Sequence, residues 1–194
     1  DSASRNLARY IDTIADKYIP NLNTILVYRL DRFGRGGHHR PFNDAGFAAV
    51  RIMETNEHYD RQHQDLRTED GVEYGDTIEG VDFDYTAKLT SLNAVTMASM
   101  AWAPAPPKEV KITGAVTANT SFSWAKNDDE NIAGYKIYWR ETTSSTWDYS
   151  RLVNKLNNYT LDGIVIDNFI FGISTVNSKG FESLVTFPQG TFRD

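Results

Sequence analysis

Residues 2–19 place apolar side chains at intervals of three and four positions, which is the spacing of one face of an α-helix. That face consists of Leu7, Tyr10, Ile11, Ile14 and Tyr18. Ser2 or Ser4 offers a side-chain oxygen to cap the first turn, and Pro20 ends the helix because it has no backbone N–H. The pattern predicts an amphipathic helix over residues 2–19.

Two apolar runs without alternation follow, TILVYRL at 24–30 and AAVRIM at 48–53. Such runs predict strands that are buried on both faces. Between them, PFNDAGF at 41–47 begins with proline and predicts a short helix. A second long helix is predicted from its cap, Asp82, onward. This order of elements is typical of an α/β layered fold. Because two strands make a thin domain, we expect part of the sheet to be missing from this chain.

The hydrophobic period changes to two after the proline-rich segment PAPP at 104–107, which predicts a stiff linker. Beyond it, short alternating stretches are separated by Asn, Asp, Gly and Ser clusters. These stretches are VKI, SFSW, YKIYW, FIFGIS and SLVTF. The pattern predicts an all-β antiparallel sandwich over residues 108–194. The predicted organisation is therefore an α/β domain over residues 1–103, the linker, and the sandwich.

The second half resembles a fibronectin type III domain. The resemblance rests on Trp124 in the second predicted strand, GYKIYW in the third, and YTLDG before FIFGISTVNSKGFES. Phe169 stands where that family usually has tyrosine, so the usual tyrosine hydroxyl hydrogen bond is expected to be lost. Modules of this family bind, space or stabilise, and the predicted strands carry no histidine and no clustered carboxylates.

Composition excludes several classes of function. The formal net charge is −6 and the pI is about 5.2, which does not favour nucleic acid as a partner. Cysteine is absent, so neither disulfides nor thiolate chemistry is available. No apolar run reaches the length of about 18 residues that a membrane-spanning helix needs. No signal sequence is recognisable either.

Candidate chemistry concentrates where the histidines are, because all four lie between His38 and His63. Carboxylates accompany them at Glu54, Glu57, Asp60, Asp65, Glu69 and Asp70. A zinc site built from several loops uses these residue types, whereas solvated loop histidines are the simpler interpretation. The window contains neither an H-E-x-x-H helix nor cysteine, which excludes a zincin motif and a structural zinc finger.

The order of segments over residues 20–103 resembles the C-terminal part of the catalytic domain of bacterial zinc-dependent aminopeptidases. This exopeptidase family includes leucyl aminopeptidases and has glutamate carboxypeptidase as a distant relative. The matching blocks are GHHRPF at 37–42, GFAA at 46–49, YDRQH at 59–63 and DTIEGVD at 76–82. In the family, tyrosine and histidine of the third block are adjacent, whereas three residues separate them here.

The resemblance implies a pair of zinc ions in the full-length enzyme, none of them tightly bound by this chain alone. It implies His63 as the last zinc ligand, with His58 as the alternative. Tyr59 would hold the substrate carbonyl oxygen as it becomes an oxyanion. His38 and His39 fall in a block that shapes the floor of the site, so they are expected to support the site without binding metal.

The resulting hypothesis is a C-terminal fragment of a zinc aminopeptidase that removes N-terminal residues from peptides. Residues 1–23 contain no histidine and no glutamate, so the other ligands and the general base would lie upstream and the fragment would be inactive alone. A peptide is the expected substrate, and the missing part or a second copy is expected to cover the open sheet edge. The expected location is periplasmic or secreted. Two alternatives stay open: a metal-free binding or adhesion protein on the same scaffold, and an unrelated α/β plus β-sandwich protein with incidental histidines.

Overall fold

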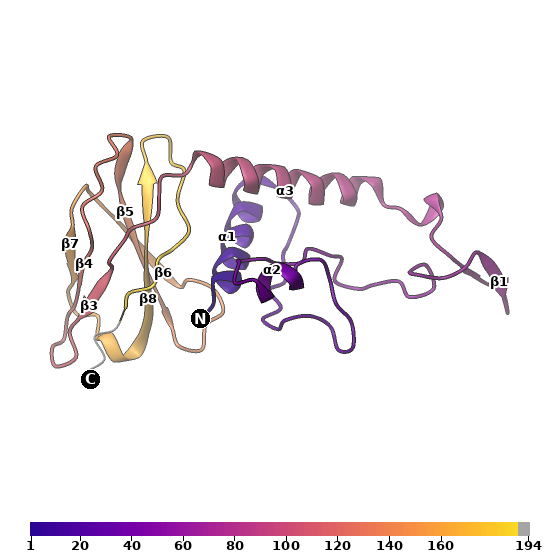
Figure 1. Cartoon of the computed structure of the whole chain (residues 1–194), viewed down its shortest axis with the longest axis horizontal. Helices are drawn as coiled ribbons and strands as arrows, with labels where there is room; N and C mark the ends of the chain where they lie inside the picture. The colour runs from indigo at the N-terminus through magenta and orange to yellow at the C-terminus, as the bar shows by residue number, and fades with distance from the viewer. Residues whose placement is uncertain (190–194) are drawn as a thin grey trace. The chain divides into compact units, whose positions relative to one another are not determined.

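The structure is a computed structural model, and it describes residues 1–189. The chain divides into two compact units, Asp1–Val95 (unit 1) and Thr96–Asp194 (unit 2) (Figure 1). Unit 1 contains α1 (Ala3–Tyr18), α2 (Arg40–Asp44), β1 (Arg67–Glu69), β2 (Val72–Tyr74), the 3-10 turn η1 (Ile78–Gly80) and the first part of α3 (Phe83–Trp102). Unit 2 contains the end of α3, β3 (Lys111–Thr113), β4 (Thr120–Ser123), β5 (Ile132–Glu141), β6 (Tyr149–Val153), β7 (Asn158–Leu161), η2 (Ile166–Asn168) and β8 (Phe169–Asn177).

The two long helices form where the sequence predicts them. Ser2 Oγ caps α1 by accepting a hydrogen bond from the Arg5 N–H at 3.2 Å. Asp82 Oδ1 does the same for α3, accepting from the Tyr85 N–H at 2.9 Å. Among residues 1–189, neither these helices nor any other is long and apolar enough to cross a membrane.

The small core of unit 1 lies between α1 and the first part of α3. Its buried members are Ile11, Ile14, Ala15, Ile19, Leu22 and Leu92. Partly buried Val50 and Ile52, from an extended segment, pack against it. The apolar stripe of α1 is therefore used as the sequence pattern predicts, with one face buried and the other solvated.

The α/β sheet predicted for the first half is wrong. Residues 24–30 and 48–53 have no regular secondary structure, and neither is paired in a strand in the described part of the molecule. The side chains of Ile25 and Val27 are 64% and 60% exposed. A strand exists only when its N–H and C=O groups meet a neighbouring strand, and the described residues offer none here. The partial exopeptidase sheet is thus replaced by two helices, loops and unpaired extended segments.

A two-stranded hairpin, β1–β2, stands where the sequence predicts only a polar loop. Its strands pair antiparallel with Thr68 opposite Glu73. Asp70 and Gly71 form the turn with φ values of 50° and 79°. Two successive positive φ values match the twist of a hairpin, and Asp-Gly is a preferred pair for them.

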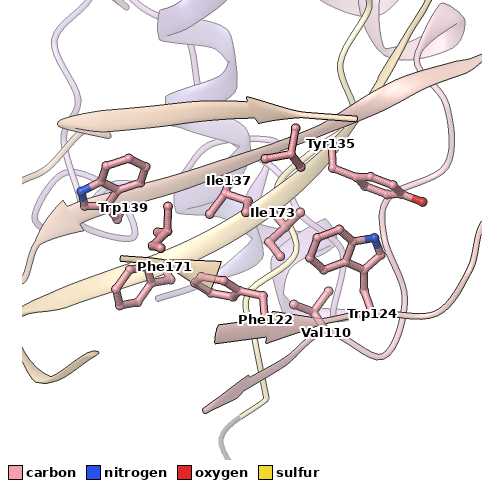
Figure 2. Close-up of a cluster of buried hydrophobic side chains, with 10 residues drawn as sticks. Val110, Phe122, Trp124, Tyr135, Ile137, Trp139, Phe171 and Ile173 are labelled. Carbon is pink, nitrogen blue, oxygen red and sulfur yellow. The ribbon is translucent and has the colours of Figure 1, made fainter. Parts of the chain in front are cut away.

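Unit 2 is a sandwich of two three-stranded sheets, with strand orders β3-β4-β7 and β6-β5-β8. All pairings between these strands are antiparallel. The inner faces meet in one core, shown in Figure 2, made of Val110, Phe122, Trp124, Tyr135, Ile137, Trp139, Val153, Leu161, Phe171 and Ile173. The period-two pattern of the second half therefore folds as predicted, because each strand finds its partner within the unit.

Aromatic side chains join the two sheets of the sandwich. Phe122 of β4 meets Phe171 of β8 edge to face at 5.4 Å between ring centroids. Trp124 meets Tyr135 at 4.9 Å. These geometries are the favourable ones for aromatic pairs in a core. The last predicted strand, residues 183–187, forms a single isolated bridge to β8, between Thr186 and Ile173.

Candidate functional site

The four histidines lie in unit 1 and differ in exposure. His38, His58 and His63 are exposed, whereas His39 is 9% exposed. Tyr59, beside His58, is 64% exposed. Three histidines and the tyrosine are therefore available to a ligand, and His39 belongs to the interior of the unit.

His39 stands just before α2 and closes the turn that follows residue 30. Its Nε2 donates to the Leu30 carbonyl at 2.8 Å and lies 3.9 Å from Asp31 Oδ2. A Cβ added at Gly37 would lie 2.8 Å from His39 Nδ1 and 3.2 Å from Arg51 Cδ, so only glycine leaves room for both side chains. His39 thus ties the turn together by packing and hydrogen bonding.

A group of polar and charged side chains around two buried carboxylates adjoins this turn, and we call it the Glu57 cluster. Its members are Asp31, Arg32, Arg35, Arg51, Glu57 and Gln62. The Glu57 carboxylate is 5% exposed and contacts Arg32, with Arg35 Nη1 at 3.0 Å and Arg51 Nη2 at 3.6 Å. Gln62 Nε2 donates to Glu57 Oε1 at 3.1 Å. One carboxylate therefore joins the segments around residues 32–35, 51 and 57–62.

Both carboxylates of the cluster are held in the ionised form. The Arg32 backbone N–H donates to Asp31 Oδ1 at 2.7 Å, and this bond is the main reason why the pKa of Asp31 is lowered despite burial. For Glu57, burial acts to raise the pKa, but the Gln62 hydrogen bond and the charges of Arg32 and Arg35 outweigh it and lower the pKa. The cluster at neutral pH thus contains two negative and three positive side chains.

The loop 57–63, which carries Tyr59 and His63, is also fixed at its far side. The Gly75 N–H donates to the Asp60 carbonyl at 2.9 Å. Arg61 Nη1 donates to Thr77 Oγ1 at 3.1 Å. These contacts join the loop to the base of the β1–β2 hairpin and to the segment before η1.

His63 itself has a left-handed backbone, with φ at 54°. Such a conformation is uncommon for a residue other than glycine, and it is found disproportionately at functional positions. Its side chain is exposed and directly follows Gln62, whose side chain donates to Glu57. The loop therefore presents the imidazole to the outside while its neighbour anchors the backbone.

A cavity of about 800 Å³ lies in unit 1 between α1, α3 and the extended segments around residues 22–32 and 49–57. Its polar end is formed by Asp31, His39, Arg51 and Glu57. Three buried atoms at this end have no hydrogen-bond partner among the described residues: Asp31 Oδ2, His39 Nδ1 and Arg51 Nη1. Arg51 Nη1 lies 3.7 Å from Asp31 Oδ1, and Asp31 Oδ2 lies 3.9 Å from His39 Nε2, so charge attraction rather than hydrogen bonding joins these groups.

The family resemblance implies a zinc site to which residues of unit 1 contribute. Among residues 1–189, no group of three or more His, Cys, Asp or Glu side chains is arranged to hold a metal ion. Zinc sites in enzymes use three protein ligands. The described residues therefore do not by themselves fit a zinc ion, and His63 and His58 are at most single contributors to such a site.

Sequence reasoning missed the Glu57 cluster, although a signal was present. Asp31 directly follows the apolar run 24–30, and Arg51 interrupts the run 48–53. Charges inside apolar segments are rarely buried without partners, so opposite charges at Asp31 and Arg51 could have been paired from the sequence. The role of Glu57 needed the fold, since it is one of several acidic residues in a polar loop.

Comparison with known proteins relates the chain to fungal proteins over nearly all its length. No protein-family profile matches it. It is 44% identical over 191 residues to a probable zinc metalloprotease of Leptosphaeria maculans, covering 97% of this chain and 44% of that protein. It is 42% identical over 189 residues to one of Pyrenophora teres f. teres, covering 97% and 39%. The chain thus spans about two fifths of the length of these curated relatives.

Solved structures with similar regions are fibronectin type III domains. The domain of the human collagen alpha-1(XX) chain shares 13% identity at a TM-score of 0.37, covering 48% of this chain and 90% of that one. An Fn3-like protein from Clostridium thermocellum shares 18% identity at a TM-score of 0.37, covering 47% and 98%.

Proposed function

We propose that this chain is the C-terminal part of a zinc-dependent peptidase, with unit 1 bordering the metal site. The observation that carries the proposal is the 44% identity with a protein named a probable zinc metalloprotease, over 97% of this chain. That stretch includes both loop 57–63, which carries His58 and His63, and the sandwich. The resemblance of residues 20–103 to zinc aminopeptidases favours the removal of N-terminal residues from peptides.

Within this proposal, His63 is the ligand that the chain contributes, and His58 is the alternative. The family resemblance favours His63, which is exposed and directly follows Gln62, the residue whose side chain donates to Glu57. Tyr59 lies in the same loop and is exposed, so its hydroxyl is available to a substrate carbonyl oxygen. The remaining ligands and the general base come from outside this chain, which is why we expect the chain alone to be inactive.

The partner that covers unit 1 is then the rest of the longer polypeptide. The relatives have more than half of their length outside the matched region. Ile25, Val27 and Leu30 expose 64%, 60% and 55% of their surface along an unpaired extended segment. Such a segment is a template for strand pairing. An added strand along residues 24–30 would pair with the backbone of this segment and partly cover these side chains.

Hydrolysis of a chromogenic leucyl amide with added zinc tests the proposal. The chain and the full-length gene product should be assayed in parallel, with His63→Ala and His58→Ala variants of the longer protein. We expect activity only in the longer protein, abolished by His63→Ala and largely kept by His58→Ala. If the longer protein holds no zinc and cleaves nothing, the same scaffold serves binding, and the peptidase proposal is wrong.

A further inference from the structure

We infer that Glu57 is a positioning residue: its buried carboxylate sets the conformation of loop 57–63 and thereby the place of His63. The inference rests on the proposed function only for the role of His63. The conformational part concerns the chain as described, without metal.

The first observation is that Glu57 is shared among partners from three segments. It contacts Arg32, lies 3.0 Å from Arg35 Nη1 and 3.6 Å from Arg51 Nη2, and accepts from Gln62 at 3.1 Å. Its side chain is 5% exposed. Hydrogen bonds to a buried charged group are stronger than those between neutral groups, so this carboxylate fixes geometry that a surface pair would not.

The second observation is that the contacts of Glu57 close the loop onto itself. Glu57 opens the loop, and Gln62 is the residue directly before His63. Gln62 donates to Glu57, while Arg35 contacts the Gln62 Oε1 and the Glu57 Oε2 together. The triangle of Glu57, Gln62 and Arg35 therefore holds both ends of the loop to the turn after residue 30.

The third observation is the balance of charge. The three guanidinium groups around Glu57 repel one another, and Glu57 is the carboxylate that all three contact. Arg32, Arg35 and Arg51 are 14%, 32% and 28% exposed, so water screens their repulsion only in part once the carboxylate is removed. A neutral glutamine at this position keeps the size of the side chain but not its charge, so the arginines are expected to separate and release the loop.

Amide hydrogen exchange on the chain tests the conformational part. We expect Glu57→Gln to accelerate exchange about tenfold at the Arg61 and Gly75 amides, which donate to the His58 and Asp60 carbonyls, while the sandwich strands exchange as before. Gln62→Ala, which keeps the charge balance, should accelerate the same amides about threefold. Glu57→Asp should restore part of the protection. The matched control is Glu69→Gln, because Glu69 pairs with Arg67 at 3.1 Å but is 61% exposed. Unchanged exchange in both Glu57→Gln and Gln62→Ala would overturn the inference.

Zinc affinity of the full-length gene product tests the link to His63. We expect Glu57→Gln to weaken zinc binding about tenfold or more, which is the usual effect of losing a residue that orients a ligand, and Glu69→Gln to leave it unchanged. If the loop loosens and zinc affinity is unchanged, the positioning role is wrong although the proposed function stands. If the unsubstituted full-length protein binds no zinc, the proposed function fails, and only the loop-ordering part of the inference survives.

Discussion

The two units bury their apolar side chains to different extents. In unit 2, ten side chains from two sheets form one core, and Ile137 and Ile173 are 0% exposed. In unit 1, six side chains form a small core, and a cavity of about 800 Å³ adjoins it. Apolar side chains such as Ile25 and Phe33 stay 64% and 91% exposed.

This difference teaches that local propensity makes a strand only where a partner strand is present. The β5 and β8 sequences find each other within unit 2 and pair from Ile132 to Glu141. Residues 24–30 are as rich in β-branched and aliphatic side chains, yet the described chain offers them no neighbour. Unit 2 therefore contains the strands that its sheets need, whereas unit 1 leaves apolar side chains of residues 24–30 exposed.

The largest expected effect is on the sandwich core. Ile137→Ala should lower the free energy of unfolding of unit 2 by about 3 kcal/mol, because it opens a cavity in a closed core. Leu152→Ala, at a position 67% exposed, should change it by less than about 0.5 kcal/mol. Urea unfolding followed by tryptophan fluorescence measures both, since all four tryptophans lie in unit 2. Equal effects would contradict the description of this core.

The same substitution in unit 1 should be less damaging. Leu92 is 1% exposed but lines the cavity, so fewer atoms surround it than surround a residue in the sandwich core. Leu92→Ala should lower the free energy of unfolding of unit 1 by about 2 kcal/mol, the low end of the usual range. Histidine ring signals in NMR report this unit alone, because all four histidines lie in it. If Leu92→Ala lowers the free energy of unfolding as much as Ile137→Ala does, the two cores do not differ in packing as described.

Acidification should unfold unit 1 before unit 2. The pKa values of Asp31 and Glu57 are lower in the folded chain than their ordinary values. These carboxylates therefore stabilise unit 1 fully above about pH 5 and lose that contribution as the pH falls below about 4, through their folded pKa values. We expect the histidine signals to lose their dispersion on acidification before tryptophan fluorescence changes. Coincident transitions in the two probes would contradict this order.

The smallest effect on stability is expected at the exposed extended segment. Ile25→Ser should change the free energy of unfolding by less than about 0.5 kcal/mol, because the side chain is 64% exposed. It should nevertheless weaken self-association of the chain and binding of an apolar dye, both measured beside the unsubstituted chain. If the unsubstituted chain is monomeric and binds no dye, the expectation that another polypeptide segment covers this surface is wrong.

The sequence predicted those elements whose cause lies within a few residues. The helix caps at Ser2 and Asp82 and the period-two strands of the sandwich follow from local spacing, and they are found. The strands at 24–30 and 48–53 failed because pairing depends on residues far away or outside the chain. The same limit applies to Glu57, whose partners come from positions up to 25 residues distant.

The assignment of His63 also goes beyond local pattern. Nothing in the spacing of the loop distinguishes His63 from His58, and the family resemblance decided between them. The structure adds that His63 follows the anchored Gln62 and has φ at 54°. The role of His63 as a metal ligand, and that of His58 as its alternative, stay predictions until metal binding is measured.

Zinc content after dialysis, measured by plasma mass spectrometry, tests the central claim most directly. Three proteins are compared: this chain, the full-length gene product, and its His63→Ala variant. We predict about two zinc ions per full-length molecule, a clear loss in the variant, and less than one ion in the chain alone. A full-length protein without zinc, or one whose zinc content His63→Ala leaves unchanged, would contradict the account.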